Sequence, residues 1–80
     1  MITSNQSRAG RALIGITQDA LAKASSVNVR TIMDFEKRNR IPIPATLQAI
    51  QNGLASLGVE LISENGGGAG VRLAKPGSPD

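Results

Sequence analysis

The stretch TQDALAKASSVNVRTIMDFEKRNRIP, residues 17–42, decides the fold of this chain. Thr17 and Asn28 are favourable N-caps for helices over 18–24 and 28–37. The polar residues between these two helices are typical of a tight turn. The stretch therefore predicts two short helices joined by a turn, with basic residues gathering at the end of the second helix.

Apolar residues recur at helical spacing through this stretch. Val27, Ile32 and Phe35 fall on one face of the second helix, which predicts that this face is buried. We expect them to share a core with three apolar residues that precede them, Leu13, Ile16 and Leu21.

One further helix is predicted on each side. The first has a cap at Ser4 or Ser7 and runs to about Leu13, before Gly15 ends it. Its apolar stripe is expected to be Ala9, Ala12 and Leu13. The last runs over about 45–57 with Pro44 in its first turn, and its apolar residues are Leu47, Ile50, Leu54 and Leu57.

The period of the pattern changes after residue 58. VELIS (59–63) and VRLAK (71–75) alternate apolar with polar residues, and Asn65-Gly66 opens a glycine-rich connection between them. A lone hairpin is marginally stable in water, so it should pack on the helices or pair with a second copy. We therefore predict a mainly α fold with four helices over 1–58, a C-terminal β-hairpin over 59–75 and a disordered tail over 76–80.

Composition excludes several classes of protein. The 80 residues include no cysteine and no histidine, which argues against disulfides, zinc fingers and Cys/His nucleophiles. The carboxylates show no paired spacing, and a chain of this length encloses a substrate poorly. We expect no enzymatic activity, no metal or other cofactor, no membrane association and a cytoplasmic location.

Positive charge is concentrated in the first 44 residues. They hold seven basic side chains against three acidic ones, a net charge of +4, whereas residues 45–80 have a net charge of −1. The basic half coincides with the helix pair, which favours a polyanionic partner. A solubilising role fits the same cations equally well, so charge alone does not decide between the two.

Residues 6–44 resemble the lambda-repressor/Cro-like helix-turn-helix family of bacterial and phage transcription regulators, also called the XRE type. The resemblance is carried by Thr17-Gln18 before Leu21-Ala22, then by Val27, Thr31-Ile32, Phe35-Glu36 and a basic run into Pro42. It implies a lambda-repressor-like DNA-binding domain. Such a protein binds double-stranded DNA in a sequence-specific way, as a homodimer on two half-sites, and regulates transcription.

Two positions depart from the family pattern. Ser26 in the inter-helix turn and Arg38 after the third helix stand where the family usually has glycine. Both positions often need a positive φ, which is unfavourable for residues with a side chain. Because asparagine tolerates that conformation better than arginine, we expect Asn39 to adopt it instead of Arg38.

The resemblance assigns the helix 28–37 to the major groove. On its outer face, Arg30 can donate two hydrogen bonds to guanine, and Val29 can contact a thymine methyl group. Asn28 can cap the helix and also reach a phosphate or a base. Asp34 can accept from a cytosine amino group or orient Arg30, and Thr31 can either pack or contact a phosphate.

Phosphate contacts are expected at both ends of the helix pair. The resemblance assigns one to Gln18, at the start of the second helix, where backbone amides also favour an anion. Flexible cations just past the third helix extend this set: Lys37, Arg38 and Arg40. The resemblance also implies an ion pair between Arg11 and Glu36, which we interpret as structural.

A protein-binding module is the alternative function. An antitoxin-like or adaptor subunit would grip a partner protein with the hairpin and the fourth helix, and substitutions at Gln18 or Arg30 would then have no effect. The segment 66–70 is interpreted as a hairpin turn, because no Lys-Ser/Thr pair follows it as in a phosphate-binding loop. Single-strand binding by stacking is disfavoured, because Phe35 is the only aromatic residue.

Overall fold

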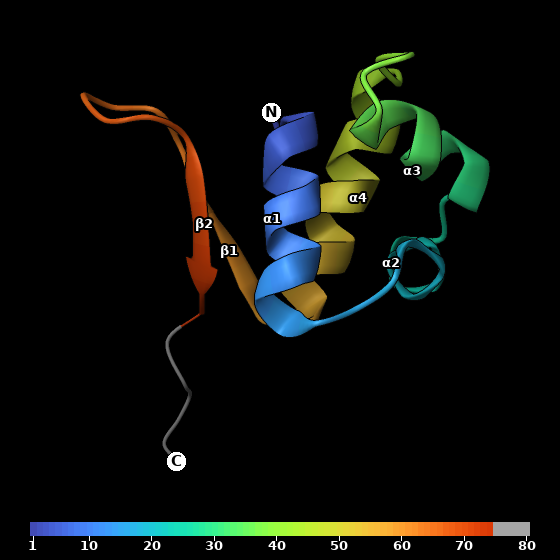
Figure 1. Ribbon diagram of the computed structural model, residues 1–80, viewed down its shortest axis with the longest axis horizontal. Helices are drawn as coiled ribbons and strands as arrows, with labels where there is room; N and C mark the ends of the chain where they lie inside the picture. The colour runs from blue at the N-terminus through green and yellow to red at the C-terminus, as the bar shows by residue number, and fades with distance from the viewer. Residues whose placement is uncertain (75–80) are drawn as a thin grey trace.

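The structure is a computed structural model that describes residues 1–74, and this part of the chain is mainly helical, with four helices and one antiparallel hairpin (Figure 1). The elements are, in order, α1 (Ser4–Ile14), α2 (Gln18–Ser25), α3 (Val29–Glu36), α4 (Pro44–Ser56), β1 (Val59–Ile62) and β2 (Gly70–Leu73). The predicted disorder of residues 76–80, like Lys75 at the end of the predicted hairpin, lies outside the described residues.

Side chains cap the first three helices. Thr17 accepts from the N–H of Ala20, and Asn28 accepts from the N–H of Arg30, which confirms both predicted caps. The cap of α1 is Thr3, which exchanges hydrogen bonds with Gln6 in a capping box, so the prediction of Ser4 or Ser7 was wrong. α4 has no side-chain cap and begins with Pro44, whose missing N–H is not needed there.

The same hydrogen-bonded motif ends three successive helices. Just past α1, α2 and α3, one residue has a left-handed backbone, with φ of 70° at Gly15, 57° at Ser26 and 63° at Arg38. At each end the N–H of this residue bonds to the carbonyl three residues back, and the next N–H bonds to the carbonyl five residues back. This pair of bonds is the Schellman motif, which requires the left-handed residue.

The left-handed residue after α3 was predicted to be Asn39, and this is wrong. The N–H of Asn39 bonds to the carbonyl of Asp34 at 2.9 Å, and the N–H of Arg38 bonds to that of Phe35 at 3.0 Å. These bonds place Arg38 in the left-handed position, because the motif fixes which residue turns the chain. The hydrogen bonds of the helix end thus outweigh the preference of asparagine for this conformation.

The hydrophobic core joins α2, α3 and α4. As predicted, Leu21, Ile32 and Phe35 are buried, and Ile16 and Val27 are partly buried against them. α4 contributes three residues of its predicted apolar face, Leu47, Ile50 and Leu54, and the ends of the fold add Ile2 and Val59. Leu57, also predicted on that face, is 40% exposed because it lies past the last turn of α4.

α1 packs through small and polar residues. Its buried residues are Gln6, Ser7 and Gly10, and a Cβ added at Gly10 would lie 3.2 Å from Leu54 and 3.3 Å from Val59. A side chain at position 10 would make a tight contact there, so glycine favours the close approach of α1 to α4 and β1. The predicted buried stripe was therefore wrong, since its residues lie on the exposed side of α1: Ala9, Ala12 and Leu13.

The hairpin packs on α1, one of the two arrangements predicted for it. Its register runs from Val59 opposite Leu73 to Ile62 opposite Gly70. The amide of Gln6 donates to the carbonyl of Ile62 at 3.2 Å and to that of Gly70 at 3.0 Å. One buried side chain of α1 therefore ties both strands to the helices.

No helix within residues 1–74 combines the length and the apolar character needed to cross a membrane.

Candidate nucleic-acid interface

One face of α3 is buried, and the other is partly open to solvent. Ile32, Phe35 and Glu36 form the buried face. Figure 1 shows that α3 lies on the side of the molecule away from the hairpin. Within α3, Arg30 is exposed, and the other residues of its outer face are half-buried: Val29, Thr31, Met33 and Asp34.

The predicted site residues of α3 differ in their exposure. Asn28 and Arg30 are exposed, whereas Val29, Thr31 and Asp34 are half-buried. The cations after the helix are all exposed: Lys37, Arg38 and Arg40. The three cations follow α3 directly in the chain, so they lie beside the C-terminal end of the helix that carries Arg30.

Asn28 has a defined structural role in addition to any contact with a partner. Its side-chain oxygen accepts from the N–H of Arg30 at 2.8 Å and so starts α3. The amide nitrogen of Asn28 is left to point toward solvent or a ligand, because the side chain is exposed. Lys23 of α2 lines the same shallow depression as Asn28 and Val29, and sequence reasoning did not single it out.

Asp34 does not orient Arg30. Although the two residues are four apart on α3, they make no hydrogen bond or ion pair with each other; the ion pairs within residues 1–74 are Arg11–Glu36 and Arg72–Glu60. The helical spacing permits such a contact but does not require it, because both side chains can instead be hydrated. Arg30 is thus left to extend from the helix.

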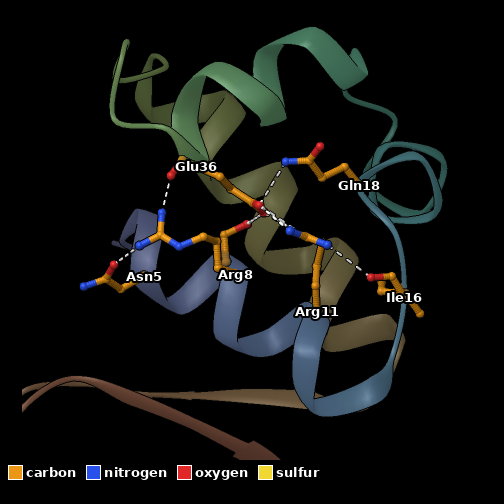
Figure 2. A network of polar contacts seen from close by, with 7 residues as sticks. Asn5, Arg8, Arg11, Ile16, Gln18 and Glu36 are labelled. Carbon is orange, nitrogen blue, oxygen red and sulfur yellow. Dashed lines mark hydrogen bonds and ion pairs between the residues drawn. The ribbon is translucent and has the colours of Figure 1, made fainter.

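A buried carboxylate holds α1, α2 and α3 together (Figure 2). Glu36 is 3% exposed, and its two oxygens accept from Arg11 at 2.6 and 3.0 Å, which is a bidentate pair. Ser7 of α1 donates to the same carboxylate at 2.5 Å, and Gln18 of α2 donates to it at 3.2 Å. Arg11 also donates to the carbonyl of Ile16 at 3.2 Å. This confirms the pairing of Arg11 with Glu36 and gives that pair three further partners.

The network keeps Glu36 charged. Burial raises the pKa of its carboxyl, but the hydrogen bonds from Arg11, Ser7 and Gln18 and the charge of Arg11 lower it by more. The net pKa therefore lies below the ordinary value of 4.5. A charged, fully hydrogen-bonded Glu36 fixes how α3 sits on α1 and α2.

Gln18 lies half-buried at the start of α2, with its side chain directed toward Glu36 (Figure 2). The phosphate contact that the resemblance assigns to Gln18 stays a prediction. One N–H of the Gln18 amide is engaged by Glu36, which leaves the second N–H for another acceptor. The structure thus adds a positioning role that the sequence pattern did not reveal.

A second polar cluster lies at the start of α1, and sequence reasoning missed it. Arg8 donates to the backbone carbonyl of Glu36 and to the side chain of Asn5 (Figure 2). Arg38 donates to the same Asn5 oxygen at 2.8 Å. Two arginines from distant parts of the sequence therefore meet beside the end of α3.

A comparison with models of protein families finds no match for this chain, and no curated protein matches it either. The fold and this surface describe a small helical domain that presents a partly exposed helix face next to a group of basic side chains.

Proposed function

We propose that this protein is a sequence-specific, double-stranded DNA-binding transcription regulator of the lambda-repressor/Cro-like type. In this proposal residues 1–58 form the DNA-binding domain, and α3 enters the major groove. The hairpin is an extension of that domain. Two copies bind two half-sites about one helical turn, roughly 34 Å, apart.

The observation that carries the proposal is the two-sided character of α3. Its inner face is locked by Ile32, Phe35 and the Glu36 network, while its outer face carries exposed Arg30. A rigid helix with a solvent-exposed arginine near its N-terminus suits reading of guanine O6 and N7. Val29 beside it offers a methyl surface to thymine.

The cations after α3 support the same proposal. Lys37, Arg38 and Arg40 are exposed and lie where the chain leaves the helix. They can neutralise phosphates on either side of the groove that α3 occupies. The second N–H of Gln18 supplies a neutral phosphate donor at the start of α2, held in place by Glu36.

Exposed leucines support the dimer. We call Leu13, Leu57 and Leu73 the leucine patch; they are 43, 40 and 57% exposed. They stand at or next to the ends of α1, α4 and β2, which lie together at the lower edge of Figure 1. Large apolar side chains that are exposed near one end of a molecule favour a protein interface at that end.

The first test is direct binding of DNA. A preferred sequence is selected from a library of randomised duplexes, and the Kd for that duplex is measured by fluorescence anisotropy. We expect Arg30→Ala to weaken binding by about 1–3 kcal/mol, which is roughly 5- to 150-fold in Kd, because a bidentate base contact is lost.

Arg72→Ala is the matched control for that test. It removes the same charge from an exposed arginine of the hairpin, so we expect less than about a twofold change in Kd if binding is local to α3. The proposal would be contradicted if the selection yielded no preferred sequence. It would also be contradicted if Arg30→Ala and Arg72→Ala weakened DNA binding equally. Affinity for the preferred duplex that does not fall with added salt would contradict it as well.

A protein-binding module is the second candidate function, and the leucine patch is the observation that favours it. In that case the patch would receive a different protein, and the protein would act as an adaptor or antitoxin-like subunit. Substitutions on the α3 side separate the candidates, because neither Arg30→Ala nor Gln18→Ala would affect binding of a partner at the patch.

A further inference from the structure

A cleft of about 300 Å³ lies at the end of the molecule opposite the leucine patch. It is bounded by the start of α1, the end of α3 and the segment 37–43 that leads into α4. Its floor is apolar and belongs to the core: Ile2, Phe35 and Leu47 are 3, 5 and 7% exposed. A volume of this size is at the lower end of the range for small-molecule sites.

Two arginines line the same cleft. Arg38 and Arg40 are both exposed, and no acidic side chain is among the residues that line it. Asn5 holds the guanidinium of Arg38 through one hydrogen bond of 2.8 Å, which leaves its other N–H groups available. Arg40 makes no hydrogen bond or ion pair with the described part of the chain. The cleft is therefore apolar inside and positively charged at its edge.

An exposed isoleucine completes the edge of the cleft. Ile41 is 82% exposed, although it is a large apolar side chain beside an apolar cavity. A ligand with an apolar body would contact Ile41 on one side and the core residues on the other. A bare phosphate or a sugar would leave this apolar surface in water.

We infer that this cleft binds a small apolar carboxylate, with the apolar part over Phe35 and Leu47 and the carboxylate paired with Arg38 and Arg40. The guanidinium group is suited to this head group, because it donates two parallel hydrogen bonds to a carboxylate. The volume suits a ligand of about a dozen non-hydrogen atoms. Binding of this ligand does not depend on the proposed function.

A consequence for regulation rests on the proposed function. Arg38 and Arg40 are among the cations assigned to DNA phosphates, so a carboxylate bound to them competes for the same charges. Occupation of the cleft is expected to raise the Kd for the preferred duplex. The protein would then respond to a small apolar acid without a separate effector domain.

The test uses the full chain labelled with nitrogen-15 and three probes: octanoate, octanamide and acetate. Octanamide has the same tail without the charge, and acetate has the charge without the tail. We expect saturable shifts of the amide signals of Ile2, Phe35 and Ile41 with octanoate, with a Kd on the order of 0.1–1 mM. Octanamide and acetate should bind at least about tenfold more weakly.

Two variants of neighbouring exposed cations provide the matched comparison. Arg40→Gln should weaken octanoate binding about fivefold or more, because it removes one of the two guanidinium groups. Lys37→Gln removes the same charge from a residue that does not line the cleft, and we expect less than a twofold change. The inference would be overturned if Arg40→Gln and Lys37→Gln weakened octanoate binding equally. It would also be overturned if octanamide bound as tightly as octanoate, or if octanoate caused no saturable shift of the amide signals.

Failure of this inference can be distinguished from failure of the proposed function. If the protein binds a selected duplex but does not bind octanoate, the inferred ligand site is overturned and the DNA-binding proposal stands. Octanoate binding without a preferred duplex would confirm the ligand site and contradict the proposed function. If octanoate binds but the Kd for the preferred duplex does not change, only the proposed regulation of DNA binding is overturned.

Discussion

At the scale of the residue, two ion pairs in this protein have different consequences. The pair between Arg72 and Glu60 is exposed, with 63 and 49% of the two side chains accessible, whereas the Glu36 side chain is 2% exposed beside Arg11. Exposed pairs contribute little to stability because water and salt screen them. Removal of one partner of a buried pair leaves an unpaired buried charge, which costs about 3–5 kcal/mol.

Glu36 therefore gives stability a predictable dependence on acid. Its pKa is lowered in the folded protein, so its contribution is present above the ordinary value of 4.5. The contribution is lost as pH falls from there through the folded-state pKa, because the unfolded chain takes up the proton first. We expect urea denaturation followed by circular dichroism to show this loss below about pH 4.5.

Substitutions at both pairs check the assignment of that acid-dependent loss. Arg11→Met combined with Glu36→Gln removes both charges, so neither is stranded, although the single amide oxygen replaces only one of the two oxygens that accept from Ser7 and Gln18. We expect this variant to show a shallower loss of stability in acid. Glu60→Gln alters only the exposed pair, so its acid dependence should follow that of the wild type. If the wild type and both variants lost stability in acid to the same extent, Glu36 would not be the cause of that loss.

At the scale of the element, close contacts between helices depend on glycine. α4 passes over the end of α2 at Gly53, where an added Cβ would lie 2.8 Å from the Cβ and 2.9 Å from the Cα of Ser25. Because one of these atoms is backbone, rotation of a side chain cannot remove the clash. The two helices would have to move apart.

We therefore expect Gly53→Ala to destabilise the protein. Alanine gains about 1 kcal/mol of helix propensity, and overpacking costs about 1–3 kcal/mol, so the net loss is about 0–2 kcal/mol. The contact with the Ser25 backbone favours the upper part of this range. Thermal unfolding followed by circular dichroism should show a decrease of roughly 4–8 °C in Tm for each kcal/mol lost. Gly67→Ala in the hairpin connection meets no atom within 4 Å and is the control. An increase in Tm for Gly53→Ala would contradict the packing described here.

At the scale of the whole molecule, the two ends of the fold present different chemistry. The leucine patch lies at the end where α1, α4 and β2 terminate, and the cleft with Arg38 and Arg40 lies at the opposite end. A partner at one end leaves the other end accessible. The proposed dimer contact and the proposed ligand site can therefore be tested separately.

Sedimentation velocity at micromolar concentration tests the dimer. We expect the wild type to form dimers, and we expect Leu73→Ser to shift the distribution toward monomers, because the substitution removes apolar surface from the patch. Ile41→Ser is the control, since Ile41 is 82% exposed at the opposite end. A wild-type protein that stays monomeric both alone and with the preferred duplex would contradict the dimer. Equal effects of the two variants would mean that the patch is not the contact.

Much of the local structure could be predicted from the sequence. The caps at Thr17 and Asn28, the end of α1 at Gly15 and the antiparallel hairpin are all confirmed. Each depends on interactions between residues close in the chain, such as a side chain that accepts from an N–H two or three residues away. The exposure of Arg30 also follows the helical period.

The sequence by itself determined where most helices begin and that Gly15 ends α1, because those hydrogen bonds are made within about one turn of the chain. Only the tertiary structure decided which face of α1 is buried, because Gly10 and Gln6 face partners more than forty residues away. It also decided that Gln18 joins Glu36 and that Arg38 and Arg40 line an apolar cleft. These arrangements depend on which helices and strands pack against one another. The helical period and the capping pattern of the sequence are local features, so they do not reveal that packing.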